Sequence, residues 1–292
     1  FMIAGTGAFL YFTFSANQII NQGTRFAPYQ IVIGIIGIAA LIELTRRCVG
    51  LPILFVAGFF LIYALAVGLT NPAFLGRVKF LVRNLFYTKE GIFSTPVNVC
   101  SKYIVVFIIF GAFLERTGIS NFFIQLANCI AGKYAGGPAK VAVISSALCG
   151  MVSGSSVGNT VTTGSVTIPM MKDTGYKPEF AGAVEAASST GGQIMPPIMG
   201  AAAFLMADFV GVPYSNIIVR AILPALLYFT GIFISVHLEA KKLGLSGIPK
   251  EKLPVFKLLI RKIYLLLPLV MLVIWVSGNY MTMQKAASYA IV

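Results

Sequence analysis

The chain has 292 residues, of which 58% are hydrophobic and only 11% are charged, and its mean hydropathy is +0.88. Soluble domains carry about a quarter of charged residues, so this composition excludes a soluble protein and predicts an integral membrane protein. The net charge of +13 would suit nucleic acid, but no stacking aromatics interleave the cations, so we expect no nucleic-acid partner.

The apolar segments run continuously, without the period-two alternation of a barrel, and therefore predict an all-α membrane protein. Its length leaves room for roughly eight to ten spans or half-spans. Because the chain starts and stops inside apolar segments, we expect a fragment of a longer protein. The predicted full-length spans are 29–44, 51–69, 104–114 with the residues before it, 217–237 and 258–276.

The segment 73–93 has a different pattern. Apolar residues recur in it at helical spacing, and cations occupy the other positions, which predicts an amphipathic helix lying at the membrane interface. The alternative is an extended end of the neighbouring span. The apolar positions are Phe74, Val78, Leu81, Leu85 and Phe86, and the cations are Arg77, Lys79, Arg83 and Lys89. Further on, 119–130 is too short and mixed to span alone, and we interpret residues 132–140 as a loop.

A helical hairpin is predicted over 141–171. Its helical pattern is interrupted between Ser153 and Asn159 by small polar residues, and too few residues remain for two full crossings. We therefore expect the hairpin to enter the membrane, turn there and leave on the same side. A second interruption follows in 178–209, where the helix should stop at Gly191–Gly192 because Pro196 and Pro197 forbid its regular continuation.

The hairpin tip and this broken helix both offer hydroxyls, amides and exposed carbonyls at a common depth. Ends of half-helices hold ions in membrane proteins: their N-termini favour anions, and their C-termini with unwound carbonyls favour cations such as Na⁺. A carboxylate substrate and a coupling cation would suit the two tips. The alternative is close helix packing through small residues, which explains the glycines but not the paired prolines.

Glu185 lies in an otherwise uncharged helix, on one face with Ser188 and Ser189. A carboxylate at such a position is costly, so we expect a functional role. It can stay protonated, neutralise a cation or anchor a helix by hydrogen bonds. Asp208 is expected among lipid headgroups, and Glu115–Arg116 as a local ion pair. The four cysteines have no metal spacing, so we expect apolar fillers and no transition metal.

One motif suggests an enzyme: Gly154–Ser155–Ser156–Val157–Gly158 fits G-x-S-x-G, and Asp208 and His237 follow in hydrolase order. That motif has meaning on a strand-turn-helix elbow, whereas its flanks here are membrane helix. We therefore expect no catalytic residues. Beyond it, residues 246–292 form a basic linker and the next apolar segment. Seven cations predict, by the positive-inside rule, a cytoplasmic loop: Lys241, Lys242, Lys250, Lys252, Lys257, Arg261 and Lys262.

The runs GMVSGSSVGNTVTTGSVTIPMMK and GYKPEFAGAVEAASSTGGQIMPPIMGAAAFLMADFVGVPY resemble the large membrane subunit of tripartite ATP-independent periplasmic (TRAP) transporters, most closely the fused permeases of TAXI-type systems. The resemblance covers roughly 103–245. It implies an elevator-type fold of two inverted repeats, of which only the first, 94–245, is present. Segment 1–72 is similar to the fused small-subunit part, a weaker likeness.

The same resemblance implies a multi-pass protein of a bacterial or archaeal cytoplasmic membrane, which imports small carboxylates delivered by a periplasmic binding protein. Coupling is commonly to Na⁺, but Glu185 replaces the small residues of relatives, so H⁺ coupling through Glu185 stays open, as does a channel-like or structural component. The implied cation-binding residues are Ser153, Gly154, Ser155, Ser156, Asn159, Thr190, Gly191, Gly192 and Pro196. The implied substrate-binding residues are Ser156, Thr160, Ser189, Thr190 and Gln193.

Overall fold

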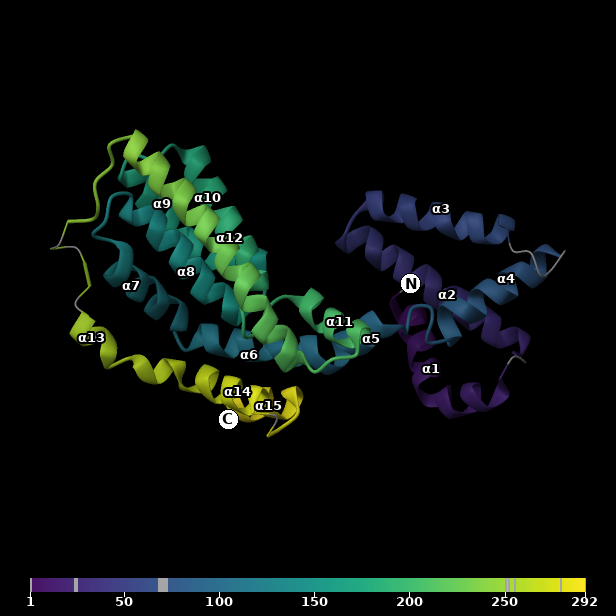
Figure 1. The fold of residues 1–292 in the computed structure, drawn as a ribbon. Helices are drawn as coiled ribbons and strands as arrows, with labels where there is room; N and C mark the ends of the chain where they lie inside the picture. The colour runs from purple at the N-terminus through teal and green to yellow at the C-terminus, as the bar shows by residue number, and fades with distance from the viewer. Residues whose placement is uncertain are drawn as a thin grey trace. The chain divides into compact units, whose positions relative to one another are not determined.

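The computed structural model describes residues 2–23, 26–67, 73–249, 251, 253–254, 256–278 and 280–291 (Figure 1). The regular elements among these residues are all helical, which confirms the all-α prediction. The chain divides into two compact units, Phe1–Asn98 and Val99–Val292. Three helices are long and apolar enough to cross a membrane, namely Pro28–Cys48, Thr95–Arg116 and Tyr214–Lys242. They contain three of the five predicted spans.

The first unit is built on α1 (Met2–Gln22), α2 (Pro28–Cys48), α3 (Leu51–Val67) and α4 (Phe74–Val82). Glycines let these helices approach closely. A Cβ at Gly37 would lie 2.2 Å from the ring of Phe86, so that ring packs directly on the backbone of α2. Phe86 belongs to an aromatic cluster in which the rings of Phe12 and Phe93 stack with their centroids 4.1 Å apart. This unit therefore has a hydrophobic core of its own.

The predicted interfacial helix is shorter than 73–93. After α4 the chain makes one π-helical turn, Arg83–Tyr87, and then leaves the helix. The amide of Ile92 donates to the carbonyl of Leu85 at 2.7 Å, which folds the following residues back as a turn. Lys89 therefore lies outside the helix. The end of the predicted span 51–69 lies partly outside the described residues, which resume at Ala73.

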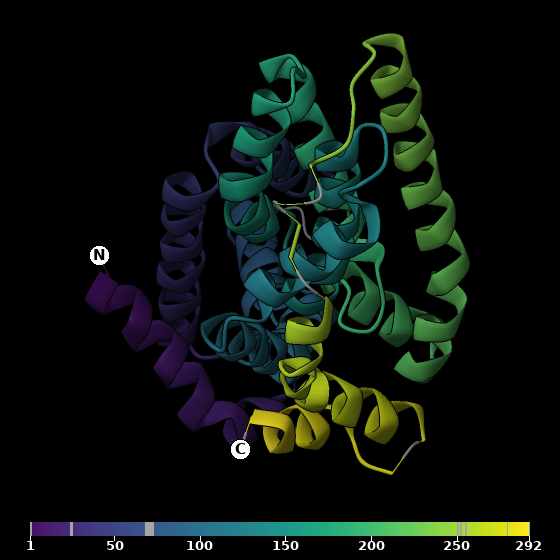
Figure 2. The ribbon, with the colours of Figure 1, turned by 90° about the vertical axis from the view of Figure 1, so that its left-hand side faces the viewer.

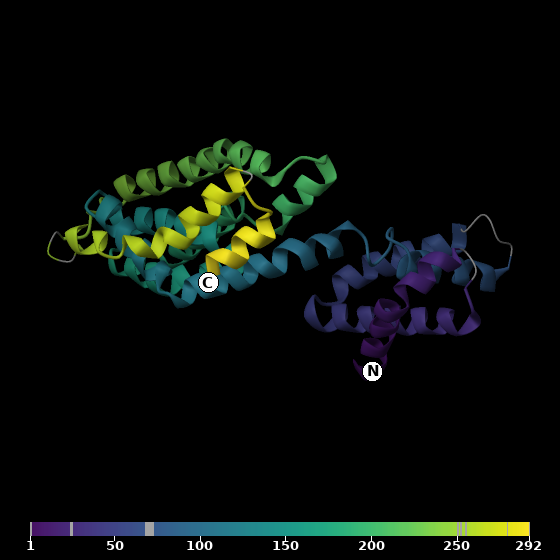
Figure 3. The ribbon, with the colours of Figure 1, turned by 90° about the horizontal axis from the view of Figure 1, so that it is seen from below.

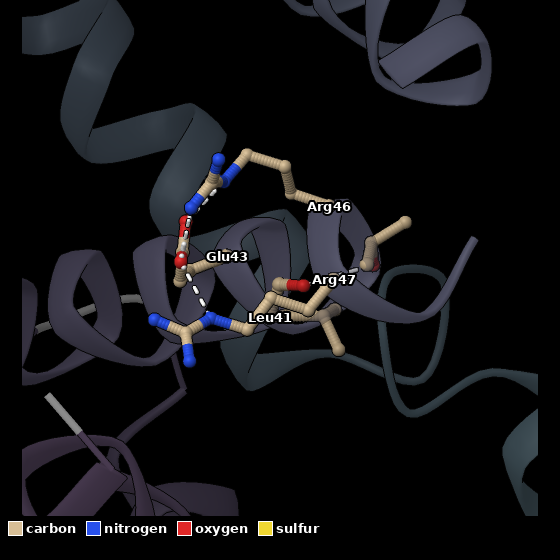
Figure 4. Close-up of polar contacts among 5 residues, drawn as sticks. Leu41, Glu43, Arg46 and Arg47 are labelled. Carbon is tan, nitrogen blue, oxygen red and sulfur yellow. Dashed lines mark hydrogen bonds and ion pairs between the residues drawn. The ribbon is translucent and has the colours of Figure 1, made fainter. Parts of the chain in front are cut away.

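The C-terminal end of α2 carries a compact ion pair. Arg46 donates to both carboxylate oxygens of Glu43 at 2.7 Å, and Arg47 donates at 2.8 Å (Figure 4). The three residues are one turn apart, so their side chains meet on one face of the helix. Two arginines at this end and one carboxylate leave a net positive charge there.

The second unit begins at Val99, the last residue of α5 (Thr95–Val99), and the helix continues through a π-helical turn (Cys100–Ile104) into α6 (Val105–Arg116). The remaining helices, in chain order, are α7 (Ile119–Ala131), α8 (Gly137–Ser153), α9 (Ser156–Asp173), α10 (Pro178–Gly191), α11 (Ala201–Val210), α12 (Tyr214–Lys242), α13 (Phe256–Ile260), α14 (Leu267–Ser277) and α15 (Met283–Ile291). The helices α8, α9, α10 and α12 lie side by side (Figures 1 and 2).

Two predicted boundaries are wrong. The span 258–276 is divided, because α13 ends at Ile260 and α14 begins only at Leu267, next to Pro268. Proline is tolerated in the first turn of a helix and disfavours helical geometry before it. The loop 132–140 is shorter than predicted for the same reason, since Pro138 lies in the first turn of α8. Lys140 is thus buried in a helix, with Nζ 3.0 Å from Nδ1 of His237.

The C-terminal helices complete the unit. α15 packs against α14 and α6 (Figure 3), and Ala286 and Ala287 are fully buried there. The aromatic rings of Phe107, Phe204 and Tyr214 stack between α6, α11 and α12. Of the predicted cytoplasmic cations, Lys250 and Lys252 lie outside the described residues.

Candidate functional site

The hairpin of α8 and α9 turns on two residues, Gly154 and Ser155. Gly154 has φ of +62°, a left-handed conformation that glycine adopts without a Cβ clash, and its amide donates to the carbonyl of Gly150 at 2.9 Å. Ser155 is the N-cap of α9 and accepts from the amide of Gly158 at 3.2 Å. These caps end one helix and start the next at once, so the turn is shorter than the predicted stretch Ser153–Asn159.

The arms of the hairpin are correspondingly long. α8 has 17 residues and α9 has 18, which at 1.5 Å per residue gives about 26 Å and 27 Å. The hydrocarbon core of a bilayer is about 30 Å thick, so each arm nearly matches it. The arms are therefore longer than the prediction of too few residues for two full crossings implied, and re-entry into the membrane stays a prediction.

The second interruption separates α10 from α11. α10 ends at Gly191, a 3₁₀ turn covers Gly192–Ile194, and α11 begins at Ala201. The irregular stretch includes a cis peptide bond between Pro196 and Pro197. The amide of Gly200 donates back to the carbonyl of Gln193 at 2.6 Å, which closes the stretch into a compact loop.

The hairpin tip and this loop are in direct contact. Gln193 donates through Nε2 to Oγ of Ser156 at 2.8 Å. Gly150 and Gly192 touch through their backbones, since a Cβ on Gly150 would lie 2.3 Å from Cα of Gly192. The amide of Ile198 donates to the carbonyl of Met151 at 3.3 Å. Interruptions that lie about forty residues apart in the sequence therefore form one structure.

A cavity of about 320 Å³ lies where they meet. It contains the N-cap residues of two helices, Ser155 of α9 and Gly200 of α11, and the first two residues of α11. Helix N-termini present unpaired amides and a partial positive charge, which favours an anion. Among the described residues the lining contains no charged side chain. It consists of Ile104, Phe107, Ile108, Ser153, Gly154, Ser155, Gln193, Ile198, Met199, Gly200, Ala201, Ala202 and Phe204.

Glu185 of α10 is fully buried in a cage of hydroxyl groups. Its Oε1 accepts from Ser146 at 2.8 Å, from Ser189 at 3.0 Å and from Thr163, and its Oε2 accepts from Thr167 at 2.5 Å. The donors come from α8, α9 and α10. One carboxylate thus ties the hairpin to the broken helix.

The chain matches the family model of the tripartite ATP-independent periplasmic transporter, DctM component, over residues 36–292. It belongs to this family. The match begins inside the segment 1–72 that the resemblance related to a small subunit, and it confirms that the chain is a transport protein rather than an enzyme.

Curated relatives agree with the match. The chain is 28% identical to the C4-dicarboxylate TRAP transporter large permease protein DctM of Pseudomonas aeruginosa, over 69% of this chain and 47% of that protein. It is 26% identical to the isethionate TRAP transporter permease protein DctMQ of Oleidesulfovibrio alaskensis, over 82% of this chain and 38% of that protein. The sialic acid TRAP transporter permease protein SiaT of Haemophilus influenzae is 26% identical, over 49% of this chain and 23% of that protein. The chain spans less than half the length of these relatives. It is a multi-pass membrane protein.

In this TRAP permease chain the structure brings several predicted site residues together. Ser153, Gly154, Ser155 and Gln193 line the cavity, and Ser156 holds Gln193 in place. Behind the tip, Gly192 packs on Gly150, as described above. Asn159 is buried and donates to the carbonyl of Ser146 at 2.8 Å, while its Oδ1 has no hydrogen-bond partner within the part of the chain that the structure describes.

Other predicted residues lie elsewhere. Thr190 is exposed, and its hydroxyl donates to the carbonyl of Ala186 at 2.8 Å. Gly191 faces α12, where a Cβ would meet Tyr228 at 2.5 Å. Pro196 lines a separate apolar groove beside α12. The hydroxyl of Thr160 donates to its own helix at Ser156, and Ser189 belongs to the Glu185 cage rather than to the cavity.

Sequence reasoning missed three donors to Glu185, namely Ser146, Thr163 and Thr167. The i, i+4 spacing of the two threonines places them on one face of α9, and this was the available signal. Ser188, which the sequence places on one face with Glu185, is buried, and its Oγ has no hydrogen-bond partner among the described residues. Only long-range packing decides which helix faces the carboxylate.

Two further expectations can be compared with the structure. The predicted ion pair Glu115–Arg116 is wrong: among the described residues no salt bridge joins them, and adjacent residues of a helix point in different directions. The hydrolase motif lies at a helix–helix turn and not on an elbow, and His237 contacts Lys140 instead of Ser156. Asp208 is exposed in the last turn of α11.

Proposed function

We propose that the chain forms part of a secondary active permease of a bacterial or archaeal cytoplasmic membrane. The permease imports small organic carboxylates that a periplasmic binding protein, of the TAXI type, delivers to it. An inward Na⁺ gradient drives the transport, and the hairpin and broken helix move together as one element of an elevator. The observation that supports this most strongly is the cavity that joins the hairpin tip to the N-termini of α9 and α11.

The cavity suits a small anion. Each helix N-terminus carries the equivalent of roughly half a positive charge. The amides of Ala201 and Ala202 lie in the first turn of α11, where no carbonyl of the helix is placed to accept them. No lysine or arginine of the described part of the chain lines the cavity, so a carboxylate would be held without forming a tight ion pair. Because its charge is only partly neutralised, the carboxylate can also be released, which transport requires.

The hairpin tip suits a cation. The carbonyls at the C-terminal end of α8 point toward the tip, where Ser153 and Gly154 lie. Backbone carbonyls and hydroxyls are oxygen ligands of the kind that hold Na⁺ at the ends of half-helices in transporters. A cation there would also offset the charge of a bound carboxylate.

The relatives support the substrate class. Their names assign C4-dicarboxylates, sialic acid and isethionate to proteins of P. aeruginosa, H. influenzae and O. alaskensis. All three substrates are small organic anions. By this likeness we assign a small organic anion to the present chain, with a carboxylate as the favoured class.

The experiment uses the full-length permease and its binding protein in proteoliposomes. Ala202→Asp places a carboxylate at the N-terminus of α11 within the cavity, where it occupies the anion position and repels the substrate. We expect uptake to fall at least about tenfold, since 1.4 kcal/mol of lost binding corresponds to a factor of ten. Ala202→Asn is the matched control, of the same size without the charge, and should keep a larger share of uptake.

The outcomes separate the alternatives. Equal loss in the Asp and Asn variants, with both inserted and folded, would show that charge at this helix end does not matter and would contradict the anion site. Uptake that ignores a Na⁺ gradient would contradict Na⁺ coupling. A channel-like component would instead give substrate flux that depends on neither an ion gradient nor the binding protein. For a structural component, the variants would affect assembly and not uptake.

A further inference from the structure

We propose that Glu185 is a proton-binding site of the transport cycle, in which the proton resides on Oε2 and the hydroxyl of Thr167 turns to accept it. The inference rests on the proposed transport function and adds a second coupling ion, a proton, at a position separate from the hairpin tip. It starts from the unequal surroundings of the two carboxylate oxygens. Oε1 has three hydroxyl neighbours, whereas Oε2 has only Thr167, at 2.5 Å.

The hydrogens available to the cage can be counted. Each hydroxyl has one hydrogen to donate. Thr163 Oγ1 also lies 2.8 Å from the carbonyl of Asn159, and Thr167 Oγ1 lies 3.0 Å from the carbonyl of Thr163. Each threonine therefore chooses between the carboxylate and its own helix. Those two carbonyls accept backbone amides within α9 in any case, so they lose little when the hydroxyl turns away.

Two complete hydrogen-bond arrangements follow. When Glu185 is ionised, Ser146, Thr163, Thr167 and Ser189 all donate to it. When a proton binds Oε2, the new O–H donates to Thr167 Oγ1, and Thr167 donates to the carbonyl of Thr163. The other three donors keep Oε1 as their acceptor. One proton is gained, one hydroxyl rotates, and no buried polar group of the cage is left unpaired in either state.

The charges around Glu185 favour a site that changes protonation. Among the described residues no lysine, arginine or histidine forms an ion pair with it. The titratable groups in the interior of the helices packed against it are the thiol of Cys149 on α8 and the phenol of Tyr228, which donates to the carbonyl of Ala187 at 2.9 Å. The charged residues of α8, α9 and α10 lie toward the helix ends, at Lys140, Lys172, Asp173 and Glu179. Only hydroxyls or a proton offset the buried charge.

Polar side chains connect Glu185 with the cavity along one face of α9. Ser156, Asn159, Thr163 and Thr167 follow one another at three or four residues, a distance of about 16 Å in all. Ser156 contacts Gln193 at the cavity, Thr163 contacts Ser146 at 3.1 Å, and Asn159 Oδ1 is a buried acceptor with no partner. This row offers a polar route by which a proton reaches the carboxylate.

The test measures uptake by the full-length permease with its binding protein, at fixed Na⁺ and over a series of imposed pH gradients. We expect an inward proton gradient to accelerate uptake by the wild type. Glu185→Gln, whose amide can donate to Thr167 as the protonated acid does, should lose that response and keep its Na⁺ dependence. An unchanged pH response in Glu185→Gln would overturn the proposal.

Thr167 provides the second variant. Thr167→Val removes a charge-assisted hydrogen bond from the ionised form and a weaker neutral one from the protonated form. The difference between the two should raise the pH midpoint by about one pH unit. Thr167→Ser should restore it. The matched control is Thr162→Val on the same helix, whose hydroxyl bonds only the carbonyl of Gly158, and which should leave the midpoint unchanged. A midpoint equal in Thr167→Val and wild type would contradict the assigned switch.

Infrared difference spectroscopy gives a readout that does not depend on uptake. Acidification should produce the carbonyl stretch of a protonated carboxyl in the wild type and in Thr162→Val, and this band should be missing in Glu185→Gln. Absence of a titrating band in the wild type overturns the proton site, even where Na⁺-driven uptake is intact. Absence of uptake under either gradient overturns the proposed function instead.

Discussion

Buried hydroxyl groups in this chain differ in whether the fold supplies a partner. Tyr214 is buried at the start of α12 and donates to the carbonyl of Pro197 at 3.1 Å. Tyr176, between α9 and α10, is equally buried, but its hydroxyl has no hydrogen-bond partner among the residues that the structure describes. An unpaired buried polar group costs about 1–3 kcal/mol. The two tyrosines therefore form a natural pair for mutation.

We expect Tyr176→Phe to leave the thermal stability unchanged or to raise it, because the variant removes an unsatisfied hydroxyl and keeps the ring stacked on Phe180. Tyr214→Phe should lower stability by about 1 kcal/mol, the net contribution of a typical hydrogen bond. Thermal unfolding of both variants in the same detergent measures the difference. A loss in Tyr176→Phe as large as that in Tyr214→Phe would contradict this account.

The same residue predicts a dependence on alkaline pH. Burial raises the pKa of Tyr176 from 10 to about 12. Its contribution to stability is complete below pH 10, where both states hold the proton, and it declines as the pH rises from about 10 to 12, where only the unfolded chain releases it. Between pH 8 and pH 12 the free energy of unfolding of Tyr176→Phe should therefore fall less than that of the wild type. Circular dichroism against pH measures the two curves.

Much of this residue-scale chemistry was accessible from the sequence. A lone carboxylate in an apolar helix marked Glu185, and Gly154 with Ser155 marked a turn. The partners of Glu185 were not accessible, because a threonine in a helix can face its own backbone, lipid or another helix with the same local pattern. Thr160 and Thr163 show both outcomes within one turn of α9.

At the scale of elements, the contact between the hairpin and the broken helix depends on a pair of glycines. Gly150 and Gly192 approach so closely that a Cβ on either would overlap backbone atoms of the other. Backbone cannot move aside as a flexible side chain does. The closeness also places Gln193 within reach of Ser156, so the geometry of the cavity depends on this contact.

Gly150→Ala should destabilise the second unit by roughly 1–3 kcal/mol, the usual cost of overpacking, and should reduce uptake. Gly182→Ala in α10 is the control, since no atom lies within 4 Å of the added Cβ, and alanine is the better helix former by about 0.5–1 kcal/mol. Thermal unfolding and uptake are measured for both. Equal stability of the two variants would show that the glycine contact is not tight.

The elements themselves were predictable to different degrees. Glycine and proline marked the end of α10 near its observed position, because they act through local backbone geometry. The length of the hairpin arms was underestimated, because serine and glycine near a turn can also belong to a helix when a capping side chain accepts from the free backbone amides. Ser155 does this for α9, which therefore begins at Ser156. The start of α14 is marked in the sequence by Pro268, which lies in its first turn. Hydropathy alone does not show this boundary, because the residues on both sides are apolar.

At the scale of the second unit, three connections gather at one end. The amide of Ile248 donates to the carbonyl of Gly132 at 2.8 Å, so the segment after α12 pairs with the turn between α7 and α8. Gly136 contacts both Ala240 and Tyr176, which adds the turn between α9 and α10. The positive-inside rule places the cations after α12 in the cytoplasm. All three connections should therefore face the cytoplasm.

Cysteine labelling of the full-length permease, with its native cysteines replaced, measures this arrangement. Asp173→Cys and Ser246→Cys should both react with a membrane-impermeant thiol reagent from the cytoplasmic side. Ser155→Cys lies at the far end of the hairpin, about 26 Å away by helix rise, and should react more slowly from the cytoplasmic side than the other two variants. Labelling of Asp173→Cys and Ser246→Cys from opposite sides would contradict the packing of the unit.

The cage around Glu185 has a consequence for biosynthesis. The ribosome makes a chain from its N-terminus, so Ser146, Thr163 and Thr167 leave it before Glu185 does. Inserting a lone acidic residue at the middle of a membrane helix costs about 2.5–3.5 kcal/mol on translocon scales. Here α8 and α9 can already stand as a hairpin when α10 arrives. Three of the four hydroxyl donors precede their acceptor, and the most costly side chain of the segment enters the bilayer beside groups that are ready to bond it.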